Sequence, residues 1–166
     1  MPDRLESLSG AVYNKLASLQ TVETVTWSYI YMEHLANVSI LAALLARKRG
    51  LDAELCQAAG LLHDLWLYEK GFPMTPEEHR MHGEYGSVLA REMLGENGGF
   101  SGDEIEIICR AIFNHNYKDA EHGEYDELLK DADAFAHVLK NTAYDRKYQY
   151  HGREKKVLDE LGLQTD

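Results

Sequence analysis

The chain is poor in cysteine and has few long apolar runs. Its two cysteines, Cys56 and Cys109, each stand inside an apolar helical pattern, which favours reduced core thiols over a disulfide or a metal-binding pair. No apolar run approaches the length of a membrane span, and residues 1–6 lack the basic and then apolar pattern of a signal peptide. We therefore expect a soluble, cytoplasmic protein with no membrane partner.

Positive charge is also scarce, because 17 Lys and Arg residues face 28 Asp and Glu residues and the formal net charge is −11. Proteins that bind nucleic acid draw most of their non-specific affinity from a basic surface, so this balance predicts no nucleic-acid partner. A small phosphorylated substrate stays open, because local charge decides how such a group is bound. Residues 140–156 hold six basic residues against two acidic ones, and we interpret them as a solvated terminal helix in preference to a phosphate clamp.

Helical periodicity, by contrast, is present almost throughout the chain. Asp52, Thr75 and Ser101 are predicted helix N-caps, the last two with a glutamate three residues later, and Gly50 is a predicted helix end. Residues 21–31 are rich in β-branched and aromatic residues, but without a partner strand we interpret them as a loop or an irregular helix start. Helices are predicted at about 5–19, 30–49, 53–65, 76–94, 102–115, 125–141 and 144–161. The sequence thus predicts an all-α bundle of about six to seven helices in a single domain spanning 1–166, and it leaves a homo-oligomer open.

One buried helical pattern ends in an adjacent histidine and aspartate, His63 and Asp64. Burying a charge without a partner is costly, so a core helix has no structural use for this pair. A metal ion would remove that cost, because neutral imidazole and ionised carboxylate are both good ligands. On the pair alone, we favour the interpretation in which His63 caps the helix end while Asp64 reaches solvent.

Three further residues join this pattern. His34 shares one helical face with the apolar Val38, Leu41 and Leu45, so it points toward the core. Asp131 and Asp133 lie on a later helix, two positions apart, so their side chains diverge by roughly 200° and do not easily share one ion. Periodicity does not choose between these two aspartates.

The order of these motifs resembles the HD-domain superfamily of metal-dependent phosphohydrolases. The resemblance rests on Glu-His-Leu-Ala-Asn-Val at 33–38, Gly-Leu-Leu-His-Asp at 60–64 and Lys-Asp-Ala-Asp-Ala-Phe at 130–135, and it covers residues 34–141. It implies one divalent transition metal, Mn, Fe, Co, Ni or Zn, that activates a bound water. Asp64 and His63 are the implied catalytic residues. The implied metal ligands are His34, His63, Asp64 and Asp133, with Asp131 in reserve.

Two more histidines, His82 and His115, occupy the order of extra histidines in many HD proteins. The resemblance implies that they contact the substrate's phosphate or hold a second metal. The predicted function is hydrolysis of a small phosphate ester, such as a nucleotide, by a metal-activated water. An HD-type di-iron oxygenase and a degenerate HD signalling or binding module are the alternatives. Many HD proteins continue the His-Asp pair with an apolar residue, glycine and a basic residue, whereas here the first lysine comes only at Lys70, which leaves the substrate open.

Overall fold

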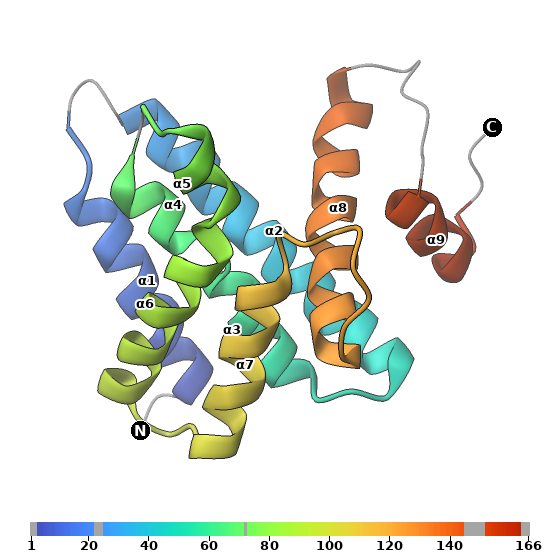
Figure 1. The fold of residues 1–166 in the computed structure, drawn as a ribbon, viewed down its shortest axis with the longest axis horizontal. Coiled ribbons are helices and arrows are strands. Elements are labelled where there is room, and N and C mark those ends of the chain that lie inside the picture. Colours follow the sequence, from blue (N-terminus) through green and yellow to red (C-terminus); the bar gives the residue numbers. More distant parts are fainter. Residues whose placement is uncertain (1–2, 22–24, 72, 145–151, 164–166) are drawn as a thin grey trace.

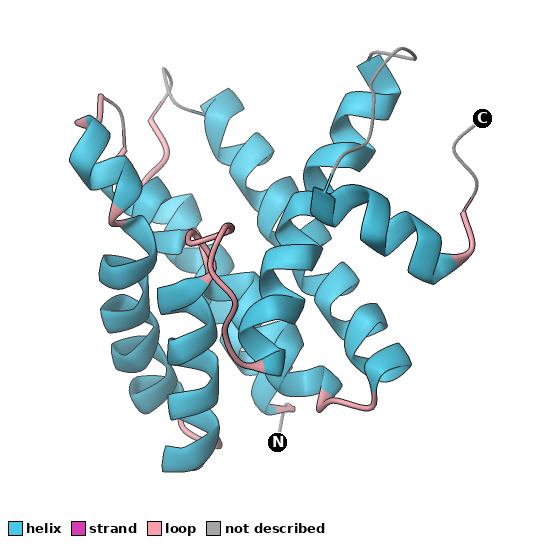
Figure 2. Ribbon diagram, turned by 45° about the vertical axis from the view of Figure 1, so that its right-hand side comes forward, coloured by secondary structure: helices cyan, strands magenta, loops and turns pink. Residues whose placement is uncertain are grey.

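The computed structural model describes residues 3–21, 25–71, 73–144 and 152–163, and within these ranges the regular secondary structure is α-helix without strands (Figures 1 and 2). The helices in chain order are α1 (Arg4–Ser18), α2 (Val25–Arg49), α3 (Ala53–Leu62), α4 (Leu65–Lys70), α5 (Pro76–Arg80), α6 (His82–Asn97), α7 (Gly102–Asn114), α8 (Glu124–Tyr144) and α9 (Gly152–Leu161). The all-α prediction is confirmed.

Local capping signals set several helix boundaries. The side chains of Asp52, Thr75 and Ser101 each accept a hydrogen bond from a backbone N–H of the following first turn, which confirms the three predicted helix starts. Gly50 follows the last residue of α2 with φ +74, a conformation that glycine adopts at little cost. These boundaries depend on residues within a few positions of one another, so they can be predicted from the sequence alone.

Four boundaries differ from the prediction. The helix predicted over 53–65 stops at Leu62, and a separate helix that was not predicted, α4, begins at Leu65. The helix expected over 76–94 is interrupted at Met81, which separates α5 from α6. Helix α2 begins at Val25, within the stretch interpreted as a loop or irregular start, and residues 22–24 lie outside the described ranges. In place of one helix over 144–161, α8 ends at Tyr144 and α9 begins at Gly152, with 145–151 outside the described ranges.

Helix α2 lies at the centre of the packing and contacts both α3 and α8, while α6 packs on α7 and α9 lies against α8 (Figure 1). Two glycines allow these close approaches. A Cβ at Gly60 on α3 would lie 2.8 Å from Ser39 Cα on α2, and a Cβ at Gly83 on α6 would lie 2.8 Å from the Phe113 carbonyl oxygen on α7.

The apolar face predicted for α2 is confirmed, because Val38, Leu41 and Leu45 are buried in the core. By length and composition, Tyr29–Arg49 would also be long and apolar enough to cross a membrane. The statement that no apolar run approaches a span was therefore wrong for this helix. Core helices of soluble proteins reach the same length and apolar composition, and α2 packs against α3 and α8.

Both cysteines are buried and free, as predicted. Burial raises the pKa of the Cys56 thiol to about 12 and that of the Cys109 thiol to about 11. Neither thiol is therefore a ready nucleophile or metal ligand at neutral pH.

Candidate metal centre

Six side chains from five regions of the chain converge at one place in the fold. His34 comes from α2 and Asp133 from α8. The His-Asp pair occupies the joint between α3 and α4, where His63 ends one helix and Asp64 precedes the next. His82 opens α6 and His115 follows the last residue of α7. His63 is fully buried and Asp64 is largely buried, so the alternative in which Asp64 reaches solvent does not describe this fold.

The first group of ligand atoms consists of two imidazole nitrogens and two carboxylate oxygens. His34 Nε2 lies 3.3 Å from His63 Nε2 and 3.3 Å from Asp133 Oδ1. Asp64 Oδ2 lies 3.6 Å from His34 Nε2 and 3.5 Å from His63 Nε2. Ligands held about 2.0–2.2 Å from one ion lie roughly 2.9–3.6 Å from their neighbours at octahedral or tetrahedral angles. The spacing of this group therefore fits one metal ion.

The second group surrounds the other oxygen of Asp64. Asp64 Oδ1 lies 3.2 Å from His82 Nε2 and 3.4 Å from His115 Nε2, and the two imidazole nitrogens lie 3.0 Å apart. These three atoms have the spacing of ligands on a second ion. Asp64 thus faces two groups of histidines with one oxygen each, which is the geometry of a bridging carboxylate.

Backbone carbonyls fix the orientation of three of the histidines. The Nδ1 atoms of His63, His82 and His115 lie 2.7, 2.5 and 2.6 Å from the carbonyl oxygens of Gly60, His79 and Ile112, each three residues earlier. A carbonyl oxygen only accepts, so each Nδ1 carries the proton and donates it. In the neutral imidazoles the lone pair is therefore on Nε2, which faces Asp64, and this is how proteins prepare a histidine to bind metal.

The surroundings of Asp64 Oδ1 test whether these residues fit a metal. This oxygen is buried and has no hydrogen-bond partner among the described residues. It faces two nitrogens that, in neutral imidazoles, carry lone pairs as well, so a cation between them is needed to make the arrangement favourable. The donor set therefore fits a divalent ion.

Asp64 also affects how readily two of the neighbouring histidines take up a proton. Burial opposes the charged imidazolium, but the neighbouring Asp64 carboxylate raises the pKa of His63 and of His82 above the ordinary value. Burial likewise opposes the charged form of Asp64, yet the surrounding histidines hold the pKa of that carboxyl well below its usual range. Metal ions and protons therefore compete for the same nitrogens.

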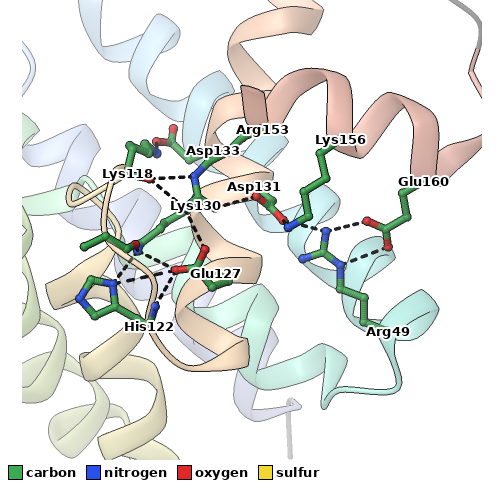
Figure 3. Close-up of polar contacts among 11 residues, drawn as sticks. Arg49, Lys118, His122, Glu127, Lys130, Asp131, Asp133, Arg153, Lys156 and Glu160 are labelled. Atoms are coloured by element: carbon green, nitrogen blue, oxygen red, sulfur yellow. Dashed lines mark hydrogen bonds and ion pairs between the residues drawn. The ribbon is translucent and has the colours of Figure 1, made fainter. Parts of the chain in front are cut away.

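The two aspartates that periodicity could not separate have different surroundings. Asp133 points to the first group, whereas Asp131 is fully buried on another side of α8 (Figure 3). Asp131 accepts from Arg49 on α2 at 2.8 Å, and from Arg153 and Lys156 on α9 at 2.9 and 2.8 Å. Asp131 therefore anchors α9 and does not face the metal centre.

This arrangement corrects the interpretation of residues 140–156 as a solvated helix. Within the described part of that segment, Arg153 is mostly buried and both Arg153 and Lys156 bind the buried Asp131. The remaining cations of the segment, apart from Lys155, have side chains outside the described part. Two cations of α9, Arg153 and Lys156, therefore pair with an internal anion, whereas Lys155 pairs with the exposed Asp159.

Two residues beside the centre were not identified from the sequence. Lys118, in the connection between α7 and α8, donates a hydrogen bond to Asp133 Oδ2. His137 lies one turn after Asp133 on α8, with its Nε2 3.6 Å from Asp133 Oδ1 and its side chain 58% exposed. The four-residue spacing on one helix could have identified His137. No periodic signal marks Lys118, which reaches the centre from an irregular segment.

The family model of the HD domain matches residues 31–137, which include all the residues of both groups. The chain belongs to the HD domain family. Its similarity to curated proteins extends to ribonuclease Y of Thermus thermophilus (33% identical over 138 residues, 81% of this chain and 22% of the relative) and of Deinococcus radiodurans (34% over 113 residues, 67% and 17%). Ribonuclease Y of Cutibacterium acnes is 29% identical over 131 residues, 78% of this chain and 21% of the relative. No solved structure matches the chain.

The chain spans about a fifth of the length of the curated relatives that it matches. Their name contradicts the prediction that excluded nucleic acid and allowed only a small phosphorylated substrate. That prediction was wrong because it used the net charge of −11, which weighs every surface residue equally. HD domains are typically metal-dependent phosphohydrolases, and the two groups here could hold divalent metal.

Proposed function

We propose that this domain hydrolyses phosphodiester bonds in RNA at a two-metal centre. The observation that carries the proposal is the position of Asp64, whose two oxygens face two different pairs of histidines. With one oxygen toward each pair of histidines, Asp64 would help to hold one ion with each pair, and paired ions cleave phosphoesters in two-metal nucleases and phosphatases. The relatives named ribonuclease Y support RNA as the substrate.

In this proposal each group of side chains has one task. His34, His63, Asp64 Oδ2 and Asp133 Oδ1 would hold the first ion, and His82, His115 and Asp64 Oδ1 the second. Mixed nitrogen and oxygen ligation suits Mn, Fe, Co, Ni or Zn. Bound divalent ions supply a water of lowered pKa and polarise a phosphoryl oxygen. The protein's own contribution is a rigid ligand set, because backbone carbonyls fix three of the imidazoles.

The proposal is tested by loading the metal-free protein separately with Mn, Fe(II), Co, Ni or Zn and adding end-labelled RNA and DNA oligonucleotides of one sequence. We expect metal-dependent cleavage of RNA that Asp64→Asn abolishes. Asp159→Asn is the matched control, since Asp159 is an exposed partner of Lys155 on α9. Undiminished cleavage by Asp64→Asn, or no cleavage with any metal, would reject the proposal.

The same assay separates the two alternatives. A di-iron oxygenase would leave RNA intact, while its reduced iron form would consume oxygen in the presence of an organic substrate. A degenerate binding module would retain no metal under any loading condition. The convergence of six potential ligands favours a metal-binding enzyme over the module.

A further inference from the structure

A lysine from outside both ligand groups reaches the metal centre. Lys118 Nζ donates to Asp133 Oδ2 (Figure 3). The other oxygen of this carboxylate, Asp133 Oδ1, lies 3.3 Å from His34 Nε2. Among the described lysines and arginines, Lys118 is the one whose ion pair joins this centre. It therefore brings a positive charge to the edge of the first group without occupying a position on the ion.

The segment that carries Lys118 is held in place by α9. Arg153 Nε and Nη2 donate to the Lys118 carbonyl oxygen at 3.2 and 2.8 Å. Arg153 in turn donates to the buried Asp131 at 2.9 Å and to Glu127 at 2.8 Å (Figure 3). The backbone of Lys118 is thus tied to buried charges of α8, so its amine approaches Asp133 from a supported position.

The amine of Lys118 is also accessible. Its side chain is 33% exposed. The neighbouring cations of α9, Arg153 and Lys156, are both paired with Asp131. An ammonium has three N–H donors, of which Asp133 takes one. Lys118 is therefore the cation placed to meet an anion that arrives at the metal centre.

We propose that Lys118 binds a non-bridging oxygen of the substrate's phosphate beside the metal ions and so determines affinity for phosphate esters. This inference rests on the proposed phosphodiester hydrolysis and adds a substrate-binding residue to it. A lysine binds phosphate as a point charge through a charge-assisted hydrogen bond. The competing explanation is that Lys118 only orients Asp133. It predicts that replacing Lys118 weakens metal binding, whereas our proposal predicts that it weakens phosphate binding.

The test compares Lys118→Met with Lys155→Met, which removes an exposed lysine of α9 that pairs with Asp159. Metal content is measured first, and binding of inorganic phosphate to the Mn-loaded proteins is then measured by calorimetry. We expect Lys118→Met to keep its metal and to bind phosphate roughly 10- to 100-fold more weakly, the usual range for a hydrogen bond to a charged group. Lys118→Arg should recover part of this loss, and Lys155→Met should match the wild type.

Each outcome separates this inference from the proposed function. Unchanged phosphate affinity in Lys118→Met, no phosphate binding by the wild type, or loss of metal from Lys118→Met would overturn the role of Lys118. Phosphate binding that depends on Lys118, in a wild type that cleaves no RNA, would uphold the site and reject the proposed reaction. RNA cleavage with the same KM and kcat in the wild type and Lys118→Met would support the proposed reaction and overturn the role of Lys118.

Discussion

Gly60 on α3 lies directly against the backbone of Ser39 on α2. A Cβ at Gly60 would lie 2.8 Å from both Ser39 Cα and Ser39 N, and Ser39 Oγ donates to the Gln57 carbonyl oxygen at 2.9 Å. The same two helices carry His34 and lead into His63, whose Nε2 atoms lie 3.3 Å apart. The packing of a glycine thus sets the separation of two proposed metal ligands.

Gly60→Ala should therefore weaken both the fold and the metal centre. The added methyl group must push α2 and α3 apart, and overpacking of this kind costs about 1–3 kcal/mol. We expect a lower urea midpoint and a raised metal dissociation constant. Gly10→Ala is the control, because a Cβ there meets nothing within 4 Å and a helical alanine gains about 0.5–1 kcal/mol over glycine. Wild-type stability and metal affinity in Gly60→Ala would contradict this account.

Local signals in the sequence were sufficient for much of the fold. The helix starts at Asp52, Thr75 and Ser101 were predictable because each cap and its N–H donors lie within three residues. The break at Met81 carries no glycine, proline or capping side chain of its own, and it was missed.

The candidate metal centre could not be predicted from local sequence signals alone. The resemblance supplied the order His34, His63, Asp64 and Asp133, but periodicity left Asp131 open because both aspartates flank one apolar face. The structure separates them through cations that are distant in sequence, Arg49 on α2 and Arg153 on α9. No local pattern predicts that Asp131 meets such partners or that Asp64 faces two groups.

The number of bound ions should depend on the two carboxylate oxygens of Asp64. If its two oxygens bridge two ions, the wild type should retain about two ions per chain and Asp64→Asn should lose both. His82→Ala should keep about one ion, because the first group remains complete. Plasma mass spectrometry after dialysis measures the metal per folded chain, with Asp159→Asn as the control. Equal metal content in the wild type and His82→Ala would show that the second group holds none.

Replacing Asp133 and replacing Asp131 on α8 should have different effects. Asp133→Asn should lower metal affinity severely while the protein stays folded, because it removes a proposed anionic ligand. Asp131→Asn should instead lower the free energy of unfolding by about 3–5 kcal/mol, since buried cations lose their anion. Urea denaturation beside metal content distinguishes the two. Metal loss in Asp131→Asn with full metal in Asp133→Asn would reverse the assignment.

Acid should loosen the contact between α8 and α9 through Glu127. Burial disfavours its charged form, but hydrogen bonds from Lys130 and Arg153 lower the pKa of Glu127 to about 2 in the folded protein, against 4.5 ordinarily. A lowered folded pKa means that the stabilisation is complete above pH 4.5 and is lost as the pH falls toward about 2. Glu127→Gln should be less stable at pH 7 and lose less stability on acidification, as urea midpoints at pH 7, 4 and 3 would measure. The exposed Glu96→Gln should follow the wild type. An equally steep loss in Glu127→Gln would assign the acid sensitivity to other carboxylates.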